Sequence, residues 1–163
     1  MVEMPDVTRR AHITKGRAPM SSNDLVGTWQ LVSVTAQRAD GTIGEPYGSI
    51  PHGVLVYGSD GRVVTVITHQ DLDRFESDSI AAASSAEASR AFRRTLAYYG
   101  RYELDGNSGT VVHHVDACTF PNRIGEDEVR QFEIDGDRLK LTTPPMPSGG
   151  GDEAEFTLVW ERT

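Results

Sequence analysis

Short segments in which apolar and polar residues alternate recur along most of this chain, and tight turns separate them. Alternation of this kind is typical of β-strands with one buried face. Asp-Gly pairs at 40–41, 60–61, 105–106 and 135–136 mark several of the turns. We therefore expect eight strands, at Thr28–Gln37, Val54–Tyr57, Arg62–His69, Arg101–Leu104, Thr110–Cys118, Glu128–Ile134, Arg138–Thr143 and Glu155–Glu161.

A meander of about eight strands closes most simply into an up-and-down barrel, which removes exposed sheet edges and encloses a small cavity. The alternative is a two-sheet sandwich, which needs long crossing connections that these short turns do not supply. The sequence thus predicts an all-β fold, an eight-stranded antiparallel barrel over residues 23–163. Residues 1–22 carry scattered charge and no apolar period, so we expect a disordered leader there.

One helix is expected between the third and fourth strands. Ser84 and Glu87 have the spacing of a capping box. An apolar stripe at helical spacing follows at Ala88, Phe92, Leu96 and Tyr99. Gly100 stands where a left-handed C-cap belongs. We expect this helix to cap one mouth of the barrel.

Charge and motifs narrow the function classes. The net charge of −8, from 16 basic and 24 acidic residues, argues against a nucleic-acid surface. No apolar run reaches the roughly 18 residues of a membrane span, so we expect no membrane partner. A single cysteine, Cys118, excludes a disulfide framework and a cysteine zinc site. No phosphate loop, nucleophile elbow or zinc-protease motif occurs, so we expect no cofactor and no metal.

The first and the last expected strands carry the motifs of a known family. Gly27-Thr-Trp29 heads the first strand and Trp160-Glu-Arg162 stands near the chain end, which resembles the lipocalin arrangement. In lipocalins an arginine near the C-terminus packs across the tryptophan of the first strand and seals the closed end. The resemblance implies structural roles for Gly27, Trp29, Trp160 and Arg162.

A narrower resemblance is to the bacterial and fungal lipocalin-like domain family. It rests on Leu25–Ser33, Pro51–Tyr57, Ser59–Gly61, Tyr98–Tyr102, Val112–Val115, Phe120–Asn122 and Phe132–Thr143, which cover nearly the whole chain from about residue 24. In this family Phe-Pro-Asn is often followed by tryptophan. Arg123 stands there in this chain, which predicts a more polar mouth nearby.

The resemblance implies a cavity for a small hydrophobic molecule, polyketide- or terpenoid-like. The family includes ligand carriers and also enzymes of secondary metabolism, such as cyclases and isomerases. Secreted lipocalins usually carry disulfides, and the chain shows no apolar signal segment, so we expect a cytoplasmic protein.

Two adjacent histidines are the first candidates for chemistry. Neighbouring residues on a strand point to opposite faces, so only one of His113 and His114 can enter the barrel. His113 faces inward if Val111 and Val115 do, and the other register turns His114 inward. A histidine titrates near neutrality, which suits ligand contact or proton transfer. The alternative is a structural or surface histidine.

Arg130 shares strand parity with Phe132 and Ile134 and is expected to face inward. Inside the barrel it could pair with a carboxylate, enolate or phenolate of a ligand, and the alternative places its head in water at the strand end. Tyrosines suit both a ligand cavity and a plain core. The expected ligand-binding residues are Tyr57, Thr65, His69, Tyr98, Tyr102 and Phe132.

These residues leave three functions open. The first is a cofactor-free cyclase or isomerase in which His113 or His114, Arg130 and a tyrosine move protons or polarise a carbonyl. The second is a non-catalytic carrier or sensor, and the third is a filled barrel that acts through its surface. We favour the enzyme slightly, because an inward arginine and histidine exceed what sequestration requires. A homodimer through the outer sheet face is also expected, because two strands have apolar residues on both faces.

Overall fold

The computed structural model describes residues 22–148 and 151–163, so the leader expected over residues 1–22 lies outside the described residues except for Ser22. The strands are β1 (Gly27–Arg38), β2 (Ile43–Gly44), β3 (His52–Tyr57), β4 (Arg62–Thr68), β5 (Thr95–Asp105), β6 (Thr110–Cys118), β7 (Asp127–Asp135), β8 (Arg138–Thr142), β9 (Met146–Pro147) and β10 (Glu153–Arg162). The helices are α1 (Ser22–Leu25), α2 (Ser85–Arg93) and the 3₁₀ turns η1 (Ile80–Ala82) and η2 (Pro121–Arg123). No described helix is long and apolar enough to cross a membrane.

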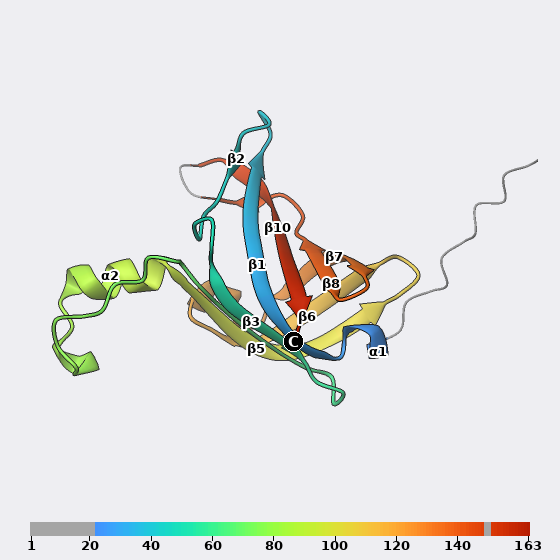
Figure 1. Cartoon of the computed structure of the whole chain (residues 1–163), viewed down its shortest axis with the longest axis horizontal. Helices are drawn as coiled ribbons and strands as arrows, with labels where there is room; N and C mark the ends of the chain where they lie inside the picture. Colours follow the sequence, from blue (N-terminus) through green and yellow to red (C-terminus); the bar gives the residue numbers. More distant parts are fainter. Residues whose placement is uncertain (1–21, 149–150) are drawn as a thin grey trace, which may run out of the picture.

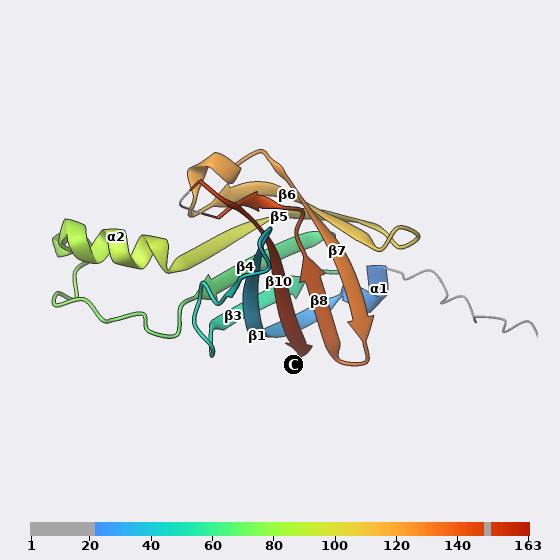
Figure 2. The same cartoon turned by 90° about the horizontal axis from the view of Figure 1, so that it is seen from above.

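The sheet closes on itself, which confirms the predicted eight-stranded antiparallel barrel (Figures 1 and 2). Strand β1 pairs with β3 on one side and with β10 on the other. The β1–β10 ladder runs from the pair Trp29 and Arg162 to the pair Arg38 and Ala154. The two-residue strands β2 and β9 add short pairings to β1 and β10.

The inward faces follow the predicted alternation, with one shift in β1. On β7, Arg130, Phe132 and Ile134 are buried while their neighbours are exposed. On β1, strict alternation predicts that Ser33 shares a face with Trp29 and Leu31, which are both buried. The register with β10 shifts between Leu31 and Ser33, and Val34 is the buried residue instead. A bulge of this kind adds one residue and reverses the parity beyond it.

One end of the barrel is sealed by the motif that suggested the family. The Arg162 guanidinium lies 4.0 Å from the centroid of the Trp29 ring. It also donates a hydrogen bond to the Val26 carbonyl oxygen at 2.8 Å. The Trp29 indole donates to the Leu25 carbonyl oxygen at 2.8 Å. Gly27 has a φ of 141°, and a Cβ there would lie 2.7 Å from Arg162 Nη1, so glycine is required.

The predicted end of the helix was wrong. The capping box at Ser84 and Glu87 is present, but α2 ends at Arg93, and Leu96, Tyr99 and Gly100 lie on β5. Residues 95–101 of β5 pair with 62–68 of β4. These ladder bonds and the burial of alternate side chains outweigh the local helical spacing.

The position of α2 also differs from the prediction. In both views α2 extends away from the barrel, beyond the start of β5, and does not lie across an opening (Figures 1 and 2). It contributes no buried residue, and Phe92 is about half exposed. The apolar stripe that suggested a cap continues into β5, so α2 alone has too little apolar surface to hold it over the mouth.

Gly100 gives a sharp test of this register. It pairs with Val63 of β4, and a Cβ at this position would lie 1.9 Å from the His114 carbonyl oxygen. We expect Gly100→Ala to lower the free energy of unfolding by about 3 kcal/mol, because backbone must move. Gly44→Ala is the matched control, since nothing lies within 4 Å of its added Cβ. Urea denaturation of both variants checks this, and equal midpoints would contradict the register.

Candidate functional site

A cavity of about 80 Å³ lies inside the barrel. Its wall is formed by Val34, Tyr47, Leu55, Thr65, Ile67, Leu96, Tyr98, Arg123, Arg130, Leu141, Thr143, Met146, Phe156, Leu158 and Trp160. Most of these side chains are apolar or aromatic, and a few polar groups are placed among them. This is the composition of a small-molecule site.

A surface groove of about 480 Å³ adjoins the cavity. Arg123, Arg130, Thr143 and Met146 line both hollows, so the groove between η2 and the proline-rich segment 144–147 leads to the interior. The inner cavity is smaller than the roughly 150 Å³ apolar cavity known to hold benzene. An aromatic ligand would therefore reach into the groove or displace Arg123 and Met146.

Tyr98 of the cavity wall belongs to a hydrogen-bonded chain of three buried side chains, and the other two lie behind it. His113 Nε2 lies 2.7 Å from Tyr57 Oη, and His113 Nδ1 lies 2.8 Å from Tyr98 Oη. Burial, helped by the charge of Arg130, lowers the pKa of His113 to about 3, so the imidazole is neutral at pH 7. A neutral imidazole has one donor and one acceptor, so one tyrosine donates to it and the other accepts from it.

One carboxylate, that of Glu128, contacts both arginines of the cavity wall, Arg123 and Arg130. Arg130 Nη2 donates to Glu128 Oε2 at 2.8 Å, and Arg130 Nη1 donates to the Val129 carbonyl oxygen at 2.9 Å. Arg123 Nε lies 3.4 Å from Glu128 Oε1. Glu128 thus bridges an arginine of β7 and an arginine of η2, which fixes both guanidinium groups at the cavity wall.

Two buried polar atoms that belong to residues of the wall have no hydrogen-bond partner among the described residues. They are Thr65 Oγ1 and Trp160 Nε1, on side chains that are 3% and 0% exposed. Buried polar groups are almost always paired, and leaving one unpaired costs about 1–3 kcal/mol. Both residues line the cavity, so a ligand there could supply the partner.

The structure brings three of the residues predicted from the sequence onto the cavity wall: Thr65, Tyr98 and Arg130. His113 and Tyr57 are buried directly behind Tyr98. The remaining aromatic candidates, Tyr102 and Phe132, belong to the core cluster. The Tyr102 hydroxyl donates to the Gly58 carbonyl oxygen at 3.0 Å.

His114 lies on the outer face, so the register that turns it inward is excluded. Its Nδ1 lies 2.6 Å from Asp127 Oδ1, and its side chain is partly exposed. The adjacent pair thus divides as expected, with His113 inside. No group of three or more His, Cys, Asp and Glu side chains in the described part of the chain is placed to hold a metal ion.

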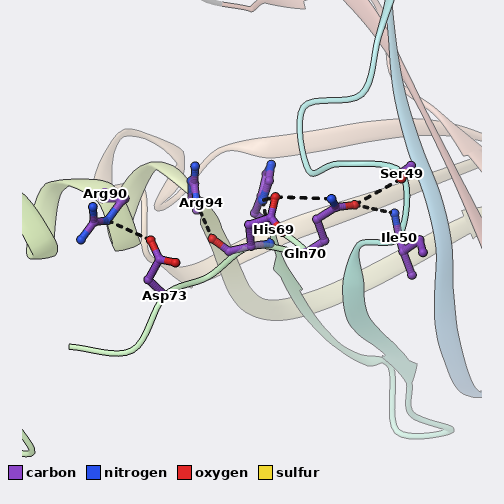
Figure 3. A network of polar contacts seen from close by, with 8 residues as sticks. Ser49, Ile50, His69, Gln70, Asp73, Arg90 and Arg94 are labelled. Carbon is purple, nitrogen blue, oxygen red and sulfur yellow. Dashed lines mark hydrogen bonds and ion pairs between the residues drawn. The ribbon is translucent and has the colours of Figure 1, made fainter. Parts of the chain in front are cut away.

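His69 lies outside the cavity wall, in a polar network at the end of β4 (Figure 3). Its Nδ1 accepts the Asp71 backbone N–H at 3.0 Å, and the backbone N–H of His69 donates to the Arg94 carbonyl oxygen at 2.9 Å. Next to it, Gln70 Oε1 accepts the Ile50 backbone N–H at 3.0 Å. The network ties the chain after β4 to the loop before β3 and to the end of α2.

Sequence reasoning missed several wall residues. Tyr47 lies in a turn and Met146 in the two-residue strand β9, and neither segment has a periodic pattern to place it. Trp160 was expected to be structural, and it also faces the cavity. Arg123 did leave a signal, because it replaces the tryptophan that often follows Phe-Pro-Asn.

The profile of the lipocalin-like domain family matches residues 26–163. This chain belongs to the lipocalin-like domain family. It is 31% identical over 94 residues to a protein of Aspergillus oryzae (strain ATCC 42149 / RIB 40) named as a 4'-hydroxy-3'-methoxypropiophenone carrier protein. That match covers 53% of this chain and 84% of the relative. A crystal structure of a lipocalin-like protein from Bacteroides uniformis matches with a TM-score of 0.44 and 15% identity, over 86% of this chain and 99% of that one.

The buried His113 of this lipocalin-like protein predicts a pH dependence of stability. Between pH 6.5, its ordinary pKa, and about 3, the unfolded chain binds a proton there and the folded chain does not. The free energy of unfolding should therefore fall as the pH falls through this range, by up to a tenfold loss in the folding constant per pH unit. We expect His113→Asn to flatten the slope measured by denaturation at several pH values.

The control for this slope is His52→Asn, at an exposed position on β3. It should leave the slope as in the wild type. Carboxylates contribute equally to all three proteins, so only the difference between slopes reports His113. An unchanged slope in His113→Asn would show that this histidine is not held neutral.

Proposed function

We propose that this lipocalin-like protein is a non-catalytic carrier that holds a small aromatic ketone, or a metabolite of similar chemistry, in its barrel cavity. The observation that carries the proposal is the pair of unpartnered polar atoms, Thr65 Oγ1 and Trp160 Nε1, on an otherwise largely apolar wall. An indole N–H can only donate, and a threonine hydroxyl can donate or accept. A ligand carbonyl oxygen is an acceptor that suits both.

The apolar wall supplies the rest of the interaction. Leu55, Ile67 and Phe156 line the cavity and would bury the body of such a ligand. Apolar burial contributes about 25 cal/mol per Å², and a few placed polar groups fix the orientation. The propiophenone compound in the name of the Aspergillus oryzae relative has both features.

The polar side chains inside the barrel support a carrier better than the cyclase or isomerase favoured from the sequence. A general base works best with a pKa near the working pH. The pKa of His113 is lowered to about 3, and both of its ring nitrogens already bond to tyrosines. His113 also does not line the cavity, so it can position Tyr98 but has no nitrogen to offer a ligand.

The proposal is tested with a defined probe, 4'-hydroxypropiophenone. The protein is titrated with the ketone while tryptophan fluorescence is followed, because Trp160 lines the cavity. The complex is then denatured and the released compound is identified by mass spectrometry and chromatography. We expect saturable one-to-one binding and complete recovery of the unchanged ketone. Conversion into an isomer or cyclised product would refute the carrier role.

Two buried threonines of the wall provide a matched pair of variants. Thr65 Oγ1 has no partner in the described protein, whereas Thr143 Oγ1 accepts the Phe156 backbone N–H at 3.0 Å. We expect Thr65→Val to keep or raise the free energy of unfolding without ligand and to weaken ketone binding about tenfold. Thr143→Val should lower the free energy of unfolding by about 1 kcal/mol.

Thermal unfolding with and without ketone measures both effects. A loss of stability in Thr65→Val equal to that in Thr143→Val would contradict the assignment of Thr65 to the ligand.

A further inference from the structure

The charges on the cavity wall do not balance. Arg123 and Arg130 line the cavity, and no aspartate or glutamate is among the described residues of its wall. Glu128 lies beside them and contacts both guanidinium groups, at 3.4 Å and 2.8 Å. One carboxylate therefore serves two arginines, which leaves one positive charge in excess among the inner charged groups at this end of the cavity. Glu126 and Asp127 also line the outer groove, but both are exposed to water, and Asp127 pairs with His114 at 2.6 Å.

Burial and charge act in opposite directions on an acidic group in this barrel. Burial raises the pKa of Tyr57 well above its ordinary value, and the charge of Arg130 only partly offsets this. An acidic hydroxyl deep in the barrel is thus kept neutral. A guanidinium in direct contact with a hydroxyl lowers the pKa of that hydroxyl more than Arg130 lowers the pKa of Tyr57, because a cation within about 4–6 Å lowers a pKa by about 1–3.

The opening of the cavity is where such contact is available. Arg123 lies on η2 with its side chain 22% exposed, and it lines both the cavity and the groove. Arg130 and Arg123 each have further N–H groups beyond those that contact Glu128, since a guanidinium carries five donors. A planar oxyanion can accept from such donors in pairs.

We propose, on the basis of the carrier function, that the cavity binds its ligand as a monoanion, with an ionised phenol-type oxygen against Arg123 and Arg130. The hydroxyl proton leaves for the solvent on binding, and no covalent bond to the protein forms. The ligand class is therefore a small aromatic molecule with an acidic hydroxyl. The excess positive charge is the feature that selects it.

The other ionisable groups that face this position from inside are Tyr47, from the loop after β2, and Tyr98 of β5, with Glu128 beside the arginines and His113 behind Tyr98. On the outer side, the exposed carboxylates of Glu126 and Asp127 line the groove. Burial raises the pKa of Tyr47, and His113 stays neutral above pH 3. A proton released on binding should therefore come from the hydroxyl of the ligand.

The test compares 4'-hydroxypropiophenone with 4'-methoxypropiophenone, which has nearly the same shape and cannot ionise. Calorimetric titrations are run about one pH unit below the pKa of the free phenol, in two buffers with different ionisation enthalpies. We expect close to one proton released per phenol bound and the absorbance band of the phenolate in the complex. The methoxy ketone should bind about tenfold more weakly and release no proton.

Two variants that change the charge at the site in opposite directions separate the contribution of charge to binding from that of shape. Arg123→Gln should weaken binding of the phenol about tenfold and leave the methoxy ketone nearly unchanged. Glu128→Gln removes the neutralising carboxylate and should tighten phenol binding severalfold. Arg138→Gln is the control, because Arg138 is exposed and pairs with Glu161 on the strands β8 and β10. Circular dichroism of each variant verifies the fold.

The outcomes distinguish this inference from the carrier function. Equal binding of both ketones without proton release would overturn the anion inference and leave the carrier standing. Weaker phenol binding in Glu128→Gln with its fold intact would also overturn it. If neither ketone binds, both proposals fail.

Discussion

The pairing of β1 with β10 is the constraint on which the rest of this structure depends. It joins the first and last strands along most of their length and leaves no open edge in the main sheet. Trp29 and Arg162 seal one end of the barrel thus formed, so access to the interior lies elsewhere, at Arg123 and Met146. Closure also creates the enclosed, low-dielectric interior in which unpaired polar atoms are costly and charges act strongly.

The polar groups of that interior differ in how completely they are satisfied. Both ring nitrogens of His113 are bonded, to Tyr57 and Tyr98, and Glu128 binds Arg130. Such satisfied groups hold side chains in place. The wall atoms of Thr65 and Trp160 remain without a protein partner. This contrast is the basis on which we propose Thr65 and Trp160 as ligand contacts.

Much of the barrel could be predicted from the sequence because its strands alternate cleanly and its turns carry Asp-Gly pairs. The same parity placed Arg130 inside and predicted that only one of His113 and His114 enters the barrel. It failed at Ser33, where a bulge changes the register, and at Tyr99 and Gly100, where sheet pairing overrides a helical spacing. The cavity wall was predicted only in part, because Tyr47 and Met146 come from segments too short to show a periodic pattern. The shape of a cavity also depends on how distant chain segments pack together.

The most direct test of a ligand in this cavity is the NMR resonance of the two indole N–H groups. The Trp29 indole is bonded to the Leu25 carbonyl oxygen at 2.8 Å, whereas the Trp160 indole has no partner among the described residues. On addition of 4'-hydroxypropiophenone, the Trp160 proton should shift downfield as it gains an acceptor, and the Trp29 proton should stay. A Trp160→Phe variant assigns the two peaks. If binding saturates and the Trp160 peak does not move, the ligand is not held as described.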